Sequence, residues 1–229
     1  MCGRYTSTTP RDQLGKLFEA LVTDRERDAS YNVSPTSDVY VVLDDGETRK
    51  VDMLRWGFVP SWSKDLKIGN RMINARAESV PTSGAYKSAF KRRRAIIPAD
   101  GFYEWKKLAG GKRKQPYYLE RSDGDPIALA GLWEEWRGPD RRGEPLRTCI
   151  IITTTPNETM APIHDRMPVI LPRSAWDAWL DPTNDDTEAL AKLLVPAPPD
   201  LLVARAVSTA VNSTRNDGPD LIEPADASD

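Results

Sequence analysis

The chain has few of the residues that build disulfide frameworks and metal sites. Its 229 residues contain two cysteines, Cys2 and Cys149, and a single histidine, His164. Two thiols cannot form a disulfide framework, and with one imidazole they cannot supply the four ligands of a structural zinc site. We therefore expect no metal, no cofactor and two free thiols in a reducing compartment.

Long apolar runs are also missing. No stretch approaches the ~20 apolar residues that cross a bilayer, and the opening residues lack the apolar segment of a signal peptide. The sequence thus predicts a cytoplasmic protein with no membrane partner. Charged residues make up 29% and hydrophobic residues 39%, a balance typical of a globular chain that is long enough for one domain with a substantial core.

Neither sign of charge is in large excess, because the formal net charge is -2. The distribution is nevertheless uneven. Residues 87–114 hold ten Lys/Arg and two acids (10 − 2 = +8), whereas residues 181–229 hold three Lys/Arg and ten acids (3 − 10 = −7). A general polycation is excluded, but a basic patch that faces a polyanion is not.

The first residues are Met1-Cys2-Gly3-Arg4. Methionine aminopeptidase removes Met1 when the next side chain is small, which would leave Cys2 with a thiol and an α-amine on one residue. Unperturbed pKa values are roughly 7.7–8.0 for such an amine and ~8.5 for the thiol. The pair can attack one carbonyl twice, first to an imine and then to a thiazolidine. The alternative is that a cysteine stands at position two by chance.

The first half of the chain favours one helix and one hairpin. Apolar spacing predicts a helix over residues 9–21, with Thr9 as its N-cap. Residues 39–43 and 49–56 read as two strands joined by a turn at Asp44–Gly46. The segments 31–35 and 56–62 are predicted to be irregular.

The second half is richer in strands. Two strands are predicted over 95–97 and 102–105, on either side of a turn at Pro98–Gly101, and a hairpin turn at Gly110–Gly111 leads to a third over 116–120. Further strands are predicted over 126–133 and 201–207, and a central buried strand over 149–155. Short helices are predicted near Lys87, over 174–180 with Ser174 as cap, and over 187–194. Together these elements predict one α+β domain of mainly antiparallel, barrel-like sheets with peripheral helices over residues 1–222, and a disordered acidic tail over 223–229.

Several polar residues are candidates for chemistry. His164 lies in a proline-bounded loop, Pro162–Pro168, and histidine exchanges protons near neutral pH. Glu104 is the acid within an aromatic strand; pointing inward it would have a raised pKa and serve as a proton shuttle, and pointing outward it would be solvated. Asn74, Arg76 and Glu78 share one parity of an extended segment, so they form either a polar edge or a functional face.

Aromatic and cationic residues also occur together. Trp56, Trp62 and Trp105, with Arg4, Arg76 and the Lys91–Arg94 run, are typical of a single-strand binder, in which cations follow the backbone and rings stack on bases. The run at Lys91–Arg94 is equally consistent with a solvated face. Cys149 stands among β-branched residues and is expected in the core.

Six stretches in order, MCGRY, YNVSPT, INARAES, ADGFYEWKK, PIHDRMPVIL and VSTAVNSTRNDGPDLIEP, span nearly the whole chain. On these the sequence resembles the SRAP domain family, whose members crosslink to abasic sites. The resemblance implies a bacterial, monomeric enzyme acting on single-stranded DNA with abasic sites, including sites at junctions with duplex. The sequence departs from the family pattern at Pro60–Ser63, where one tryptophan stands in place of the two found in some relatives.

The resemblance also implies residue roles. Cys2 would be the nucleophile, Asn74 would hold the N-terminus, Glu104 would shuttle protons, and His164 would assist opening of the sugar ring. The residues implied as DNA contacts are Arg4, Asn32, Pro35, Trp62, Arg76, Trp105 and Thr153. Removal of Met1 by the protein itself, strand scission by β-elimination and reversal of the thiazolidine are further implied activities.

Three other functions fit parts of the sequence. An N-terminal-nucleophile amidotransferase also begins Met-Cys-Gly, but the rest of that pattern is missing. A cysteine protease would use Cys2, His164 and Asn74 as a triad. A plain single-strand DNA-binding module would explain the cations and tryptophans and would leave Cys2 without a role.

Overall fold

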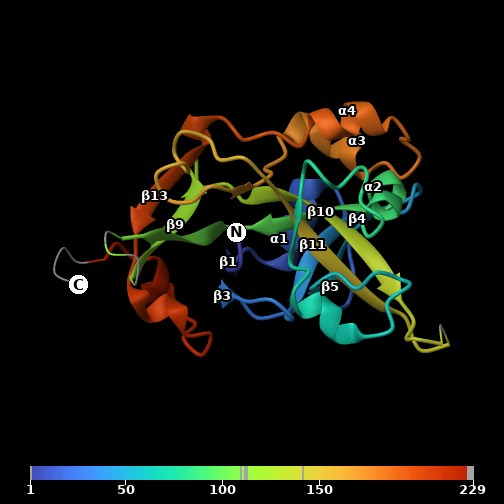
Figure 1. Ribbon diagram of the computed structural model, residues 1–229, viewed down its shortest axis with the longest axis horizontal. Coiled ribbons are helices and arrows are strands. Elements are labelled where there is room, and N and C mark those ends of the chain that lie inside the picture. The colour runs from blue at the N-terminus through green and yellow to red at the C-terminus, as the bar shows by residue number, and fades with distance from the viewer. Residues whose placement is uncertain (1, 109, 111–112, 141, 226–229) are drawn as a thin grey trace.

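The structure is a computed structural model that describes residues 2–108, 110, 113–140 and 142–225. Its chain folds into two β-sheets with short peripheral helices (Figure 1). The strands are β1 Tyr5–Ser7, β2 Leu21–Val22, β3 Ser30–Val33, β4 Asp38–Asp44, β5 Arg49–Trp56, β6 Asn74–Arg76, β7 Arg94–Ala99, β8 Gly101–Lys107, β9 Lys114–Arg121, β10 Ile127–Trp136, β11 Leu146–Thr154, β12 Met167–Pro168 and β13 Leu202–Ala206. The helices are α1 Arg11–Phe18, α2 Lys87–Arg92, α3 Trp176–Leu180 and α4 Thr187–Lys192, and 3-10 turns cover Leu66–Asn70, Arg173–Ala175, Pro199–Leu201, Thr209–Asn212 and Pro219–Ile222.

The larger sheet closes into a barrel. Its strands follow the order β12-β11-β10-β7-β4-β5-β2, with β6 beside β11, and a further pairing of β11 with β5 closes the ring β4-β5-β11-β10-β7. Within this ring the β5–β11 pairing is parallel and the others are antiparallel. The predicted α+β fold with mainly antiparallel, barrel-like sheets and peripheral helices is therefore confirmed.

Alternation along the central strand β11 divides the core into two layers. Cys149 and Ile151 belong to one cluster of buried residues, whereas Ile150 and Ile152 belong to another that includes side chains of all four helices. Successive side chains of a strand point to opposite faces, so β11 is apolar on both. This accounts for its β-branched composition, and it confirms the predictions of a central strand and of Cys149 in the core.

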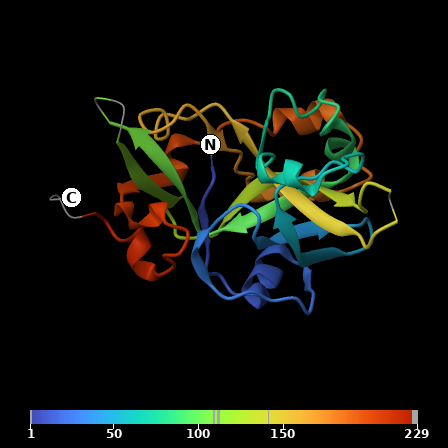
Figure 2. The ribbon, with the colours of Figure 1, turned by 60° about the horizontal axis from the view of Figure 1, so that its bottom comes forward.

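The smaller sheet has the order β13-β9-β8-β1-β3, so β1 lies between β3 and β8. Tyr5 pairs with Val33 on one side and with Phe102 on the other. Strand β1 consequently lies near the centre of the molecule, between the β9–β13 region and the barrel (Figures 1 and 2). Residues just before β1 are thus placed where the two sheets meet.

The chain passes from the barrel to the smaller sheet at Asp100. β7 pairs with β10 and β4, whereas β8 pairs with β9 and β1, so the predicted turn at Pro98–Gly101 is wrong because these strands belong to different sheets. Gly101 is required there, since a Cβ would collide with the Tyr118 ring. The Asp100 carboxylate accepts hydrogen bonds from the Thr8 and Thr9 backbone and hydroxyl groups, which fixes the crossing.

Local chemistry differs from the sequence prediction at several element ends. Thr9 does not cap α1, because its hydroxyl donates to Asp100, and α1 is shorter than predicted. Ser174 lies in a 3-10 turn before α3, which has no side-chain cap. The predicted loop at 31–35 is in part the strand β3, which the sheet partner β1 stabilises.

Arg94, the last residue of the Lys91–Arg94 run, is buried and does not belong to a solvated or DNA-facing surface. It is 2% exposed. Its guanidinium donates to five backbone carbonyl groups at the ends of α2 and α3 and in the following turn, which are those of Phe90, Lys91, Trp179, Asp181 and Asn184. The residue is a structural tie between β7 and the helices.

The start of the acidic tail runs beside β13. Val207 forms a bridge with Pro224, and the Ala225 N–H donates to the Ala206 carbonyl at 2.9 Å. Residues 226–229, the remainder of the tail predicted to be disordered, lie outside the described residues. Across the described part of the chain, no helix has the length and apolar character needed to cross a membrane.

Candidate functional site

Cys2 and Asn74 are brought together from distant parts of the chain. Cys2 precedes β1 and is fully buried, while Asn74 opens β6, which lies parallel to β11. The Asn74 Nδ2 donates to the Cys2 backbone carbonyl oxygen at 2.8 Å. Its Oδ1 is buried without a hydrogen-bond partner among the described residues. Asn74 thus contacts the N-terminal segment, and its role as the holder of the N-terminus stays a prediction.

The environment of the Cys2 thiol disfavours a resting thiolate. Burial raises the pKa of this thiol far above its ordinary value, and the nearby Glu104 carboxylate raises it further. The thiolate is the nucleophilic form of cysteine, so a protonated thiol is a poor first attacker. Amidotransferase and protease chemistry, which start from the thiolate, are disfavoured relative to chemistry that starts at the α-amine.

Glu104 points into the protein rather than toward solvent. It lies on β8 and is 1% exposed, which makes the outward-facing alternative wrong. Burial raises the pKa of its carboxyl group, and the charge of His164 opposes that rise. A carboxyl group with a raised pKa can hold a proton closer to neutral pH and release it to a neighbour.

His164 faces Glu104 from the loop that follows β11. The His164 Nε2 lies 4.0 Å from the Glu104 Oε2. Its Nδ1 accepts the Arg166 backbone N–H at 3.0 Å, which in the neutral ring leaves the proton on Nε2, toward Glu104. In the charged ring, Nδ1–H faces the exposed Asp165 carboxylate at 3.0 Å. The two groups thus lie within ion-pair distance of each other, and Glu104 is close enough to Cys2 to act on the charge of its thiol.

Arg4 and Asn32, expected as DNA contacts, bind the C-terminal segment. The Arg4 guanidinium donates to the Asn32 Oδ1 at 2.6 Å and to the Val211 carbonyl at 2.8 Å. The Asn32 amide donates to the Ser213 and Asn216 carbonyls at 3.0 and 2.7 Å. Asn32 is buried, whereas the second Arg4 nitrogen is exposed and makes a long contact to the Asn212 carbonyl. Part of the Arg4 guanidinium is therefore accessible to a ligand, whereas the Asn32 side chain is not.

The other expected DNA contacts differ in exposure. Trp62 is 55% exposed and makes no ring contact or hydrogen bond with another described residue. Arg76 is exposed at the end of β6. The Trp105 indole donates to the Asn212 Oδ1 at 2.7 Å, and Pro35 is half-buried in the loop after β3. Thr153 is fully buried and its hydroxyl donates to the Ala75 carbonyl, so this side chain does not reach the surface.

The predicted common face of Asn74, Arg76 and Glu78 holds for part of the segment. β6 ends at Arg76, and Glu78 lies in the turn that follows. There its carboxylate accepts two hydrogen bonds from the Arg166 guanidinium, at 2.7 and 2.9 Å. Glu78 is thus a partner of the His164 loop rather than a member of the strand face.

Arg166 had no predicted role, and Trp56, predicted as a ring for base stacking, is 1% exposed and therefore cannot stack on a base. Arg166 pairs with Glu78, donates to the Thr153 carbonyl and orients His164 through its backbone N–H. It stands two residues after His164 within PIHDRMPVIL, so the motif contained it. The buried Trp56 indole donates to the Ile73 carbonyl at 3.0 Å, just before Asn74, and no sequence pattern signals that contact.

A groove opens beside His164. It is lined by Trp105, Lys106, Lys107 and Lys114 from β8 and β9, and by residues 161–165 of the His164 loop. Of the candidate catalytic residues, His164 lines this groove, whereas Glu104 is buried behind it. Within the described part of the chain, no group of three or more His, Cys, Asp or Glu side chains could hold a metal ion.

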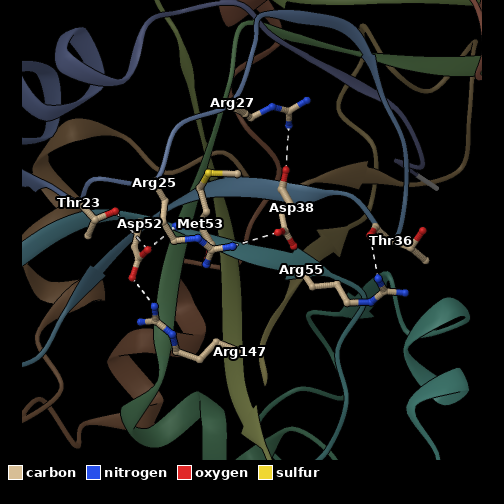
Figure 3. Close-up of polar contacts among 9 residues, drawn as sticks. All are labelled: Thr23, Arg25, Arg27, Thr36, Asp38, Asp52, Met53, Arg55 and Arg147. Atoms are coloured by element: carbon tan, nitrogen blue, oxygen red, sulfur yellow. Dashed lines mark hydrogen bonds and ion pairs between the residues drawn. The ribbon is translucent and has the colours of Figure 1, made fainter. Parts of the chain in front are cut away.

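A second concentration of arginines lies around β4 and β5 (Figure 3). Arg25 pairs with Asp38 at 3.0 Å, and Arg147 pairs with the buried Asp52. Arg55 donates to the carbonyl of Thr36, a residue with a φ of 76°, and so supports a strained backbone position beside Pro35. These guanidinium groups are occupied by internal partners, which makes the cluster structural.

Comparison with known proteins identifies relatives along almost the entire chain. The family model described as SOS response associated peptidase (SRAP) matches residues 1–214. The abasic site processing protein YoqW of Bacillus subtilis (strain 168) is 44% identical over 225 residues, covering 97% of this chain and 99% of YoqW. The abasic site processing protein YedK of Escherichia coli (strain K12) is 34% identical over 232 residues, covering 98% of this chain and all (100%) of YedK.

Solved structures agree with this relationship. A crystal structure of a Bacteroides thetaiotaomicron protein has the same fold, with a TM-score of 0.86 at 24% identity over 98% of this chain and 100% of that one. A Bordetella bronchiseptica protein aligns with a TM-score of 0.74 at 26% identity over 90% of this chain and 100% of that one. The chain belongs to the SOS response associated peptidase (SRAP) family.

Proposed function

We propose that this protein senses abasic sites in single-stranded DNA and traps the ring-opened sugar aldehyde on Cys2 as a thiazolidine, after Met1 has been removed. The names of its relatives, abasic site processing proteins, support the substrate. The observation that carries the chemistry is the placement of Cys2, held by Asn74, beside the buried Glu104 and its partly exposed neighbour His164. Met1 lies outside the described residues, so its removal is part of the proposal.

The first step is opening of the sugar. An abasic deoxyribose is a cyclic hemiacetal in equilibrium with a small amount of free aldehyde. Opening transfers a proton to the ring oxygen and removes one from the anomeric hydroxyl group. The His164 Nε2 and the Glu104 carboxyl group face each other at 4.0 Å and supply a donor and an acceptor for these transfers.

The second step forms two bonds to one carbon. The Cys2 amine adds to the aldehyde carbon, and loss of the hydroxyl group as water leaves an imine. The thiol sulfur then adds to the same carbon, and its proton passes through Glu104 to the imine nitrogen. The net change is the gain of the DNA and the loss of one water. The raised pKa of the thiol favours this order, with the amine first.

Asn74 serves as the holder in both steps. Its Nδ2 fixes the Cys2 carbonyl at 2.8 Å, which restricts the rotation of the aminothiol relative to Glu104. Such positioning lowers the entropic cost of reaction. Before ring closure, the imine is also the species from which β-elimination would break the strand, so thiol addition and strand scission compete for it.

Intact-mass spectrometry tests this function. The purified protein is measured alone and after incubation with a single-stranded oligonucleotide that carries one abasic site. We expect a protein without Met1 that gains the mass of the oligonucleotide minus one water. Cys2→Ala should gain no mass. Cys149→Ala, which removes the other buried thiol, should gain the same mass as the wild-type protein. Binding without a gain in mass by the wild-type protein would reject covalent trapping in favour of a plain binding module.

A further inference from the structure

The β8–β9 hairpin carries cations that no sequence motif assigns to the site. Lys106, Lys107 and Lys114 line the groove beside His164, and Lys107 and Lys114 are directly paired across the two strands. None of the three forms an ion pair with a described residue. The one acid on the groove wall is Asp165, which is 91% exposed and lies against the His164 ring.

These lysines differ from several of the arginines in the described part of the chain. Arg166 is occupied by Glu78, Arg25 by Asp38 and Arg147 by Asp52. An arginine in an ion pair contributes little positive electrostatic potential for a ligand, because its charge is neutralised by the carboxylate. Unpaired ammonium groups along a groove do attract a polyanion. The hairpin is therefore the better candidate for contacts to phosphates than the arginine cluster of Figure 3.

Strand geometry ties the groove to the chemistry. Lys106 stands two residues after Glu104 on β8, so both leave one face of the strand. Lys107 and its cross-strand partner Lys114 leave the other face, and side chains from both faces line the groove. The groove includes His164, whose ring faces Glu104, and continues along the hairpin with Trp105 on its wall. A DNA strand whose abasic sugar meets His164 would therefore pass the lysines that line the same groove.

We propose that this groove binds the DNA backbone on one side of the abasic site, with Lys106, Lys107 and Lys114 contacting phosphates and Trp105 bordering a base. The inference rests on the proposed function and adds a subsite to it. It makes the contribution of these lysines to the affinity depend on nucleotides that flank the lesion on that side and not on those of the other side. Stacking and cationic contacts of this kind tolerate any base sequence.

The test measures equilibrium binding of oligonucleotides that carry a tetrahydrofuran analogue, which cannot form an imine. One series extends from the analogue only toward the 5′ end and the other only toward the 3′ end. For Lys107→Gln/Lys114→Gln we expect binding to weaken roughly 10- to 25-fold at about 0.1 M salt in one series alone, and a salt slope lower by about 1.4 (about 0.7 for each single-strand phosphate that a lysine no longer neutralises). Lys16→Gln/Lys192→Gln, on exposed positions of α1 and α4, is the matched control.

Two outcomes would reject the proposal that this groove is a DNA-binding subsite. Unchanged binding in both series rejects contacts by these lysines, and an equal weakening in both series indicates a general field effect rather than a subsite. The proposed function is checked separately, by the gain in mass of the wild-type protein and of the double variant with an authentic abasic oligonucleotide at saturating concentration. If the wild type gains mass, a failure of the binding test bears on the groove alone.

Discussion

A buried carboxyl group beside an aminothiol is useful for chemistry and unfavourable for folding. Glu104 is 1% exposed, and burial raises the pKa of its carboxyl group. In the unfolded chain a Glu ionises near pKa ~4.3. Between that value and the raised pKa of the folded state, the folded protein binds a proton that the unfolded chain has lost. Stability is therefore highest below the unfolded pKa and falls as the pH rises through the folded pKa.

Removing this charge should stabilise the protein at neutral pH. We expect Glu104→Gln to have a higher melting temperature than the wild type at pH 7 and a smaller advantage near pH 4, because the wild-type carboxyl group is then protonated in both states. Thermal unfolding followed by circular dichroism across this pH range measures the difference. Glu158→Gln, at an exposed position, is the control. A difference that does not grow with pH would contradict buried ionisation as its cause.

At the scale of elements, one arginine connects the barrel to its helical cover. Arg94 begins β7 and donates to carbonyl groups of α2 and α3, and the Trp179 indole of α3 donates back to the Ala95 carbonyl at 2.9 Å. Helices of five or six residues cannot stabilise themselves in water. Their carbonyl ends depend on this guanidinium and on the apolar face that they bury.

Loss of that guanidinium leaves several buried carbonyl groups without a partner. We expect Arg94→Met to lower the free energy of unfolding by about 3 kcal/mol or more, since each unsatisfied buried group costs roughly 1–3 kcal/mol. Urea denaturation provides the measurement. The neighbouring Arg92→Met removes an exposed cation of α2 and should change stability little. Equal effects of the two substitutions would show that Arg94 is not the tie between these elements.

At the scale of the whole molecule, the site joins the two ends of the chain. Arg4 from the start and Asn32 from β3 together hold residues 211–216 near the end, and the Tyr31 N–H and carbonyl are bonded to Asp217 and Tyr103. The Trp105 indole adds a contact to Asn212. The segment that covers one side of the site is therefore fixed by polar contacts more than by its own 3-10 turns.

Asn32→Ala should release this segment. We expect the free energy of unfolding to fall by about 2–3 kcal/mol, because the Arg4 guanidinium and two carbonyl groups are left without this partner. Hydrogen–deuterium exchange should become faster over residues 209–217, while β10 and β11 keep their protection. Asn70→Ala, at an exposed position, serves as the reference. Unchanged exchange over 209–217 would mean that other contacts hold the segment.

Local sequence determined much of the secondary structure. The apolar pattern and the β-branched residues predicted the strands around Val41 and Ile151. Successive side chains of a strand lie on opposite faces, so the pattern of apolar residues shows which faces are buried. The first four residues and the motifs around Asn74, Glu104 and His164 likewise carried the chemistry of the site. The structure brings Cys2, Asn74, Glu104 and His164 to one place. Their roles stay predictions that the mass measurement tests.

Tertiary structure decided what depends on partners far away in the sequence. Whether Glu104 points inward depends on which sheet receives β8, and the sequence around Pro98–Gly101 did not reveal that the chain changes sheets there. The engagement of Arg94, Asn32 and Arg166 in internal contacts also could not be read locally, because an arginine or asparagine has the same local signature on a surface and in a buried network. The sequence by itself thus determined the reactive groups, and the fold decided which cations are occupied internally and which remain for a ligand.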